Sequence, residues 1–386
     1  MSSDVPIGAL GPPRRRILFL TGTRADFGKL KPLMRRVADD PRFDYDIFVT
    51  GMHMLARYGS TVNEIRKSGL KNLHTFINQD GSVTSQMDMV LAQTVQGLGY
   101  YIRESAPDLI VVHGDRVEAL AGAIVGALNN VLVAHIEGGE LSGTVDELIR
   151  HAVSKLCHLH FVANDHARRR LEQMGESTEA IFVIGSPDID VMLSPDLPAL
   201  DEILERYQIP FRHYCIAIYH PVTTEQHLLE MHAEAFVQGL LDSERNFVVI
   251  APNNDQGSDT VRLRMGRLEA SPRCRMIPSM RFEHFLGLLR CADGIAGNSS
   301  AGIREAPVYG VPTINVGTRQ KNRFQCASIR NVPEEASAVT SALGSLERHD
   351  PSWHFGRGDS AERFMQSLSA PSFWGTPRQK QFRDRP

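Results

Sequence analysis

The chain has 386 residues, of which 42% are hydrophobic and 23% charged, and this length and composition are typical of a globular protein with two domains. Its formal net charge of −3 gives no reason to expect a nucleic acid or a membrane surface as a partner. The five cysteines form no CxxC pair and no apolar run approaches the roughly 18 residues of a membrane span, so we expect a cytoplasmic protein with free thiols.

The first half of the chain alternates short apolar runs with longer amphipathic segments, after a Pro- and Gly-rich lead over residues 1–13 that we expect to be disordered. The strand candidates are RILFLTG, YDIFVTG, LHTFI, LIVVHGD, VLVAHIE, LHFVAN and AIFVIG. Helical spacing predicts helices over residues 29–38, 86–103, 118–128, 146–156 and 166–174. Runs that are apolar on both faces and separated by helices indicate a parallel sheet covered on both sides. We therefore predict a Rossmann-like domain over residues 1–195.

The second half repeats this alternation after a proline-punctuated linker, LSPDLPALDEI. Its strand candidates are YCIAIYH, FVVIAPN, RCRMIPS, GIAGN and PTINV, and its predicted helices cover residues 225–241, 260–268, 282–290 and 300–309. We therefore predict an α/β fold of two doubly wound domains, the second over residues 196–386. Ligands of open α/β sheets bind at the carboxyl ends of the strands, so we expect a cleft between the domains to hold the ligand.

Polar residues gather where the strands of the first domain end. The first strand leads into a Gly turn and a helix start that carries Arg24 and Lys29. Such a turn suits a phosphate or sugar hydroxyls, although an ordinary turn between strand and helix has the same pattern. Two later strands end in Asp115 and Glu137. Two carboxylates at one sheet edge favour a catalytic site over the alternative, which is a helix cap and an ion pair with Arg116.

The helix that follows the HIEGGE segment carries a further carboxylate. Asp146 and Arg150 lie four residues apart on one helical face, which is the spacing of a surface ion pair. The position directly after HIEGGE makes a catalytic role for Asp146 an equal alternative.

The second domain offers a candidate nucleotide site. His220 follows a strand and is either a structural hydrogen bonder or a catalyst. The GNSSAGIRE segment can present backbone N–H groups to a diphosphate and a carboxylate to ribose hydroxyls. Its candidate ligands, with the cation after the next strand, are Ser299, Ser300, Gly302, Glu305 and Arg319. No cluster has the spacing of zinc ligands, so we predict no metal.

Together these motifs resemble the hydrolysing UDP-N-acetylglucosamine 2-epimerases of sialic-acid biosynthesis, with the bacterial members most similar. The shared segments, in chain order, are GTRADFGKL, MHM, VHGDR, HIEGGELSGTVD, GSPD, HPVTT, PNND, GNSSAGIREAP and GTRQ. The resemblance implies a GT-B architecture whose C-terminal helix returns to the first domain. It also implies UDP bound mainly by the second domain, no cofactor, and a homodimer or homotetramer.

The resemblance also implies a role for individual residues. The catalytic residues would be the carboxylates Asp115, Glu137 and Asp146, with His220 beside the diphosphate. The substrate-binding residues would be Arg24, Lys29, Arg116, Asp190, Asn253, Ser299, Ser300, Gly302, Glu305 and Arg319. The alternatives are a non-hydrolysing 2-epimerase, a GT-B glycosyltransferase, a nucleotide-sugar sensor, and a hydrolysing enzyme for a diacetamido-bacillosamine nucleotide.

Overall fold

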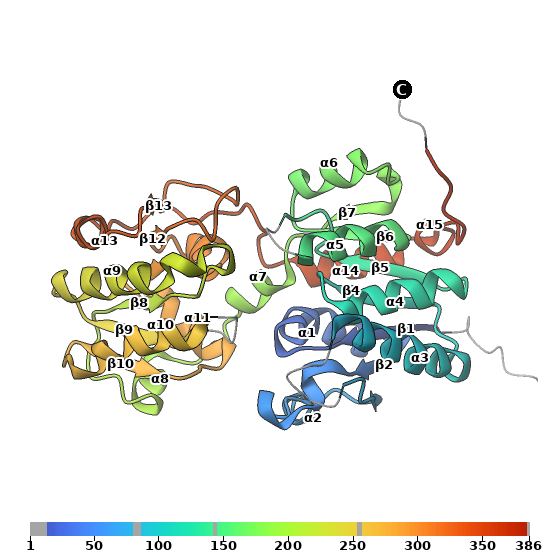
Figure 1. Ribbon diagram of the computed structural model, residues 1–386. Helices are drawn as coiled ribbons and strands as arrows, with labels where there is room; N and C mark the ends of the chain where they lie inside the picture. Colours follow the sequence, from blue (N-terminus) through green and yellow to red (C-terminus); the bar gives the residue numbers. More distant parts are fainter. Residues whose placement is uncertain (1–13, 80–85, 142–144, 253–256, 384–386) are drawn as a thin grey trace, which may run out of the picture. The chain divides into compact units, whose positions relative to one another are not determined.

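The computed structural model describes residues 14–79, 86–141, 145–252 and 257–383, and the chain divides into two compact units (Figure 1). Unit 1 comprises Met1–Asp190 and Asp359–Pro386, and unit 2 comprises Val191–Gly358. The first division falls within five residues of the predicted domain boundary. The lead over residues 1–13 and the candidate ligand Asn253 lie outside the described residues.

Unit 1 is built on a seven-stranded parallel sheet with the order β3-β2-β1-β4-β5-β6-β7. The strands are β1 (Arg15–Thr21), β2 (Phe43–Val49), β3 (Leu73–Thr75), β4 (Leu109–His113), β5 (Leu132–Ile136), β6 (Leu159–Val162) and β7 (Ile181–Val183). The winding reverses direction between β1 and β4. The carboxyl ends of these two strands, and of β5 beside them, therefore border the switch point where such sheets bind ligands.

Helices cover both faces of this sheet, as Figure 1 shows. They are α1 (Arg24–Ala38), α2 (Val62–Lys67), α3 (Met87–Ser105), α4 (Val117–Leu128), α5 (Val145–Leu156), α6 (Asp165–Gln173), α14 (Ser360–Ser369) and α15 (Pro371–Trp374), with α7 (Pro187–Met192) at the unit boundary and short 3-10 turns at η1 (Gly51–Met54), η2 (Ala56–Tyr58) and η3 (Thr178–Ala180). Alternate residues of β1 serve opposite faces. Ile17 and Phe19 pack with α1 and α14, whereas Leu18 and Leu20 pack with the cluster that includes α3 and α4.

The C-terminal segment completes unit 1. Phe364 and Leu368 of α14 are buried in the same cluster as Leu30 and Leu33 of α1. The start of α14 is capped by Asp190, whose carboxylate accepts hydrogen bonds from the backbone N–H groups of Ser360 (3.0 Å) and Ala361 (2.8 Å).

The tail beyond α15 is held by a partly buried lysine side chain. Lys380 Nζ donates to the carbonyl oxygens of Cys157 (2.7 Å) and Lys155 (2.9 Å) and pairs with the Glu176 carboxylate. Hydrogen bonds from an ammonium group to carbonyl and carboxylate oxygens are among the stronger ones in proteins. These contacts attach the segment around Lys380 to unit 1.

Unit 2 has a six-stranded parallel sheet with the order β10-β9-β8-β11-β12-β13. The strands are β8 (Cys215–Ile218), β9 (Phe247–Ile250), β10 (Cys274–Ile277), β11 (Gly294–Gly297), β12 (Thr313–Val316) and β13 (Ile329–Val332). The helices are α8 (Leu200–Arg206), α9 (Leu229–Asp242), α10 (Ser258–Met265), α11 (Phe282–Cys291), α12 (Ala301–Arg304) and α13 (Ala336–Leu343), with 3-10 turns at η4 (Thr223–Leu228), η5 (Gly266–Ala270) and η6 (Ala306–Tyr309).

The helix predicted over residues 300–309 is wrong as one element. It is divided into α12 and η6 at Glu305, because Pro307 has no N–H group for an α-helical hydrogen bond. In the described part of the chain, no helix combines the length and hydropathy that a membrane crossing requires.

Candidate functional site

The turn between β1 and α1 is held by an acidic cap. The Asp26 carboxylate accepts hydrogen bonds from the backbone N–H groups of Gly22 (2.9 Å) and Thr23 (2.8 Å) and from the Thr21 hydroxyl (2.8 Å). Thr23 and Asp26 form a capping box, which satisfies N–H groups at the helix start. The predicted ligand Arg24 begins this helix, and its half-exposed side chain pairs with Glu64.

A buried carboxylate, that of Glu118, occupies the space where a side chain at Gly22 or Gly51 would lie. Glu118 of α4 is 1% exposed, and it lies against Gly22 and Gly51. A Cβ at Gly51 would come within 2.5 Å of Glu118 Oε1, and one at Gly22 within 2.9 Å of Cδ. Glu118 Oε2 accepts a hydrogen bond from Arg116 Nε (3.2 Å). The sequence did not single out Glu118, because a Glu in the first turn of a helix usually faces solvent.

Burial lowers the pKa of Arg116, but neighbouring carboxylates, including those of Glu118 and Asp146, raise it by more, so the net shift is upward. Arg116 is therefore a permanently charged guanidinium close to the start of α5. Asp146, in the first turn of that helix, is exposed.

Glu137 is the centre of the polar cluster in unit 1. It follows β5 directly, is 2% exposed, and has a positive φ of 62°, a conformation that costs free energy in a residue other than Gly. Lys29 Nζ donates to Glu137 Oε2 (2.8 Å), and His113 Nε2 lies 3.1 Å from the same oxygen. The Ser186 hydroxyl donates to Oε1. The strained backbone thus brings this carboxylate to three partners from α1, β4 and the segment after β7.

The same lysine reaches a second buried carboxylate. Lys29 Nζ lies 3.3 Å from Asp188 Oδ2, and the Asp188 side chain is 1% exposed. The sequence predicted Lys29 and Glu137 but not His113, Ser186 or Asp188. The GSPD motif, which contains Ser186 and Asp188, was the only signal for the latter two.

Arg150 of α5 joins the ends of β4 and β5. Its Nη1 donates to the backbone carbonyl of Glu137 (2.8 Å), and its Nη2 pairs with the Asp115 carboxylate. Arg150 is only 9% exposed. Its guanidinium therefore serves the interior, which argues against the interpretation of Asp146 and Arg150 as an isolated surface ion pair.

A neutral histidine lies beneath this layer. His135 Nε2 donates to the Gly114 carbonyl (2.8 Å), and Nδ1 accepts from the Ser154 hydroxyl (3.0 Å). Complete burial holds the pKa of His135 well below its ordinary value. A Cβ at Gly138 would come within 2.8 Å of His135 Nδ1. The first glycine of the HIEGGE segment therefore leaves the space that the His135 ring occupies.

In unit 2, Asn298 connects three strand ends. It is fully buried, and its amide exchanges two hydrogen bonds with the backbone of His220, at 2.7 Å and 2.8 Å. The backbone carbonyl of Asn298 accepts hydrogen bonds from Gln320 Nε2 (2.8 Å) and Arg319 Nη1 (3.3 Å). The predicted residues His220 and Arg319 are thereby held at the same edge of the sheet.

The remaining predicted nucleotide residues follow β11. Ser299 Oγ accepts from the N–H of Ala301 (3.3 Å), and Ser300 precedes α12. A Cβ at Gly302 would come within 2.6 Å of Thr313 Cγ2, so this glycine allows the helix to pack on β12. Glu305 lies between α12 and η6.

Asp190 differs from the other predicted residues. Both of its carboxylate oxygens accept from backbone N–H groups of α14, which gives the residue a structural role. Its assignment to the sugar rests on the resemblance alone.

Comparison with known proteins gives concordant results. A family model described as UDP-N-acetylglucosamine 2-epimerase matches residues 35–369. The chain is 46% identical over 379 residues to a protein of Neisseria meningitidis serogroup B named UDP-N-acetylglucosamine 2-epimerase. The aligned region covers 96% of this chain and 99% of that protein. It is 33% identical over 359 residues to a Legionella pneumophila protein named UDP-N,N'-diacetylbacillosamine 2-epimerase (hydrolyzing), with coverage of 92% and 95%.

Solved structures agree on the fold. The structure of Methanocaldococcus jannaschii UDP-GlcNAc 2-epimerase in complex with UDP-GlcNAc and UDP matches with a TM-score of 0.75 at 19% identity, over 92% of this chain and 99% of that one. The predicted fold class, two parallel-sheet α/β domains of the GT-B type, is confirmed.

Proposed function

The chain belongs to the UDP-N-acetylglucosamine 2-epimerase family, and we propose that it is a hydrolysing member. It would convert UDP-N-acetylglucosamine and water to N-acetylmannosamine and UDP, the first step of sialic-acid biosynthesis. The observation that carries the proposal is the cluster at the carboxyl ends of β4 and β5, where Glu137 contacts Lys29 and His113 while Arg150 holds Asp115.

The substrate explains why several carboxylates are needed. In α-linked UDP-N-acetylglucosamine the C2 hydrogen and the C1 oxygen are antiperiplanar, so a base can remove the proton as UDP leaves, which gives 2-acetamidoglucal. Water then adds at C1, and a proton returns to C2 from the opposite face. The reaction therefore needs acid–base groups on both faces of C2 and cations that accept the charge of the leaving diphosphate.

The chain supplies both kinds of group. We assign the proton transfers to Asp115, Glu137 and Asp146. Asp115 and Glu137 lie on neighbouring strand ends and share Arg150, which favours a joint role at one carbon atom. The diphosphate charge is assigned to His220 and Arg319, the two residues that Asn298 holds at one sheet edge of unit 2.

The remaining ligands are assigned in two groups. Sugar-side contacts are proposed for Arg24, Lys29, Arg116 and Asp190. UDP contacts are proposed for Asn253, Ser299, Ser300, Gly302 and Glu305. We further propose that the enzyme requires no cofactor and works as a homodimer or homotetramer.

Two features favour the hydrolysing reaction over the non-hydrolysing one. The non-hydrolysing pattern has a second Glu after the first in the helix where this chain has Arg304-Glu305-Ala306, and it lacks the GGELSG segment. The Legionella relative also carries the word hydrolyzing in its name. The higher identity to the Neisseria protein, 46% against 33%, favours UDP-N-acetylglucosamine over a diacetamido-bacillosamine nucleotide as substrate.

A proton NMR time course on UDP-N-acetylglucosamine in D₂O tests the proposal. We expect free N-acetylmannosamine that carries deuterium at C2, because the incoming proton comes from the face opposite the one that lost its hydrogen. UDP-N-acetylmannosamine as the released product would establish the non-hydrolysing reaction instead. If the enzyme does not react with UDP-N-acetylglucosamine but does react with the diacetamido-bacillosamine nucleotide, the latter is its substrate.

A further inference from the structure

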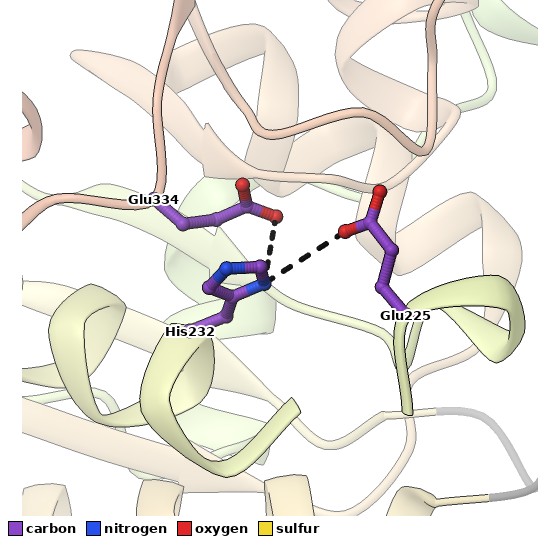
Figure 2. Close-up of side chains that lie close together, drawn as sticks. All are labelled: Glu225, His232 and Glu334. Carbon is purple, nitrogen blue, oxygen red and sulfur yellow. Dashed lines mark ion pairs between the residues drawn. The ribbon is translucent and has the colours of Figure 1, made fainter. Parts of the chain in front are cut away.

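Three side chains of unit 2 converge on one point outside the proposed catalytic and nucleotide-binding residues. They are Glu225 of η4, His232 of α9 and Glu334, which follows β13 (Figure 2). Their candidate ligand atoms all lie within 4.8 Å of one another. Figure 2 shows both carboxylates turned toward the same imidazole nitrogen. From this arrangement we propose that Glu225, His232 and Glu334 bind a divalent metal ion of the zinc class.

The spacing of the donor atoms fits a shared ion better than direct pairing. His232 Nδ1 lies 3.5 Å from Glu334 Oε1 and 3.8 Å from Glu225 Oε2. Both distances exceed the range of ordinary hydrogen bonds, which is about 2.7–3.2 Å. Ligands about 2.1 Å from a tetrahedral zinc ion are about 3.4 Å apart, which is close to the shorter of the two distances.

The charge of the cluster also calls for a cation. Within the described part of the chain, His232 is the only basic side chain in contact with either carboxylate. Glu334 is nine-tenths buried. A divalent ion would offset the charge of the two neighbouring carboxylates, and both carboxylate oxygens and neutral imidazole nitrogens are ligands of zinc.

Surrounding groups hold the donors in place. The Thr318 hydroxyl donates to Glu225 Oε1 (2.6 Å), which leaves Oε2 for the ion. The Tyr219 hydroxyl lies 3.4 Å from Glu334 Oε1. A Cβ at Gly317, whose φ is 76°, would come within 1.9 Å of the same oxygen, so only Gly permits this approach. Partners of this kind orient metal ligands.

The expected consequence of binding is local and structural. The ion would join η4 and α9 to the end of β13. It would lie next to the loop that carries Arg319, since Thr318 of that loop donates to Glu225. The proposed elimination uses none of the three ligands. The ion would therefore stabilise unit 2, while turnover would not depend on it.

Calorimetric titration of the full chain, stripped with EDTA, with ZnCl₂ tests the site. We expect one equivalent to bind, and His232→Gln and Glu334→Gln to weaken binding by at least about tenfold. The matched control is His213→Gln, since His213 pairs with a single carboxylate, Asp293, at 3.6 Å. Unchanged affinity in both cluster variants, or no binding by the native chain, would overturn the proposal.

A spectroscopic measurement on the native chain keeps the test independent of variant folding. Bound Co²⁺ should give the visible bands of a four-coordinate site with N and O ligands and no thiolate charge-transfer band. A thiolate band would place the ion at one of the five cysteines and would also overturn the proposal. Retention of the melting temperature in the metal-free variants confirms that a lost signal reports lost ligands.

Discussion

Replacing Arg150 tests whether its side chain holds the ends of β4 and β5 together, as an internal tether, or only forms a surface ion pair. In Arg150→Met the hydrogen bond from a charged group to the Glu137 carbonyl is lost, which costs about 1.5–3 kcal/mol. The Asp115 carboxylate also loses its guanidinium. Since its side chain remains 25% exposed, water compensates in part, and we add only about 1 kcal/mol. The expected decrease in the free energy of unfolding is therefore about 3 kcal/mol.

Turnover should fall as well, although Arg150 is not assigned to the chemistry. The two strand ends that it joins carry Asp115 and Glu137, and a displacement of about 1 Å at a reacting group costs about 10²-fold. We expect kcat to fall by about that factor, and Arg150→Lys to give an intermediate effect because it keeps the charge but loses the planar fork.

Urea unfolding followed by circular dichroism measures the stability, and product NMR measures kcat. The matched control is Arg168→Met, because Arg168 makes an i,i+4 pair with Glu172 while 39% exposed. It should cost no more than about 0.5 kcal/mol. If Arg150→Met unfolds within about 0.5 kcal/mol of the native chain and retains its turnover, Arg150 belongs with the surface pairs and the tether is wrong.

Four further predictions follow from the site and its surroundings. Asp146→Asn should keep UDP binding by calorimetry but lower kcat by roughly 10²–10⁴-fold; near-native kcat would leave only Asp115 and Glu137 as candidates for proton transfer. Glu305→Ala should weaken UDP binding by about 1–3 kcal/mol, and an unchanged calorimetric affinity would remove Glu305 from the nucleotide site. Turnover should survive exhaustive EDTA treatment, since Arg319 and His220 are assigned to the diphosphate; a loss that Mg²⁺ restores would contradict this assignment. The free energy of unfolding should fall as the pH drops below about 6.5, because burial lowers the pKa of His135 in the folded state and the unfolded chain binds the proton first. In His135→Gln the pH slope between 5 and 7 should be smaller, and an identical slope would show that other groups cause it.

Periodicity predicted the long elements of the fold well. The helix expected over residues 86–103 is observed as Met87–Ser105, and that over 146–156 as Val145–Leu156. Long amphipathic helices give a signal at every turn, so the ends of these two were placed within two residues. The helix expected over residues 29–38 instead begins five residues earlier, at Arg24, and the one expected over 225–241 begins four residues later, at Leu229. Strand β13, Ile329–Val332, was missed because two of its four residues are exposed, which leaves no apolar run to detect.

In the candidate site, too, residues marked by a local sequence pattern were predicted, whereas partners from distant segments were not. Lys29 and Glu137 were each visible beside a strand end, and the structure brings them into contact. Ser186 and Asp188 were not predicted as partners, because they reach Glu137 and Lys29 from the segment after β7, and no local pattern records a contact between segments so far apart in the chain. The assignments of Asp115, Glu137, Asp146 and the UDP ligands stay predictions.

Because the C-terminal segment returns to unit 1, synthesis of unit 1 begins before that of unit 2 but ends after it. The ribosome makes the seven strands of unit 1 first, but α14 emerges only after Val191–Gly358. At about 5–20 residues per second, this interval lasts roughly 10–30 s. During that time Leu30 and Leu33 lack the cover that Phe364 and Leu368 later provide. The nascent chain therefore presents an apolar face on which a chaperone can act, and the domain that is started first is the last to be finished.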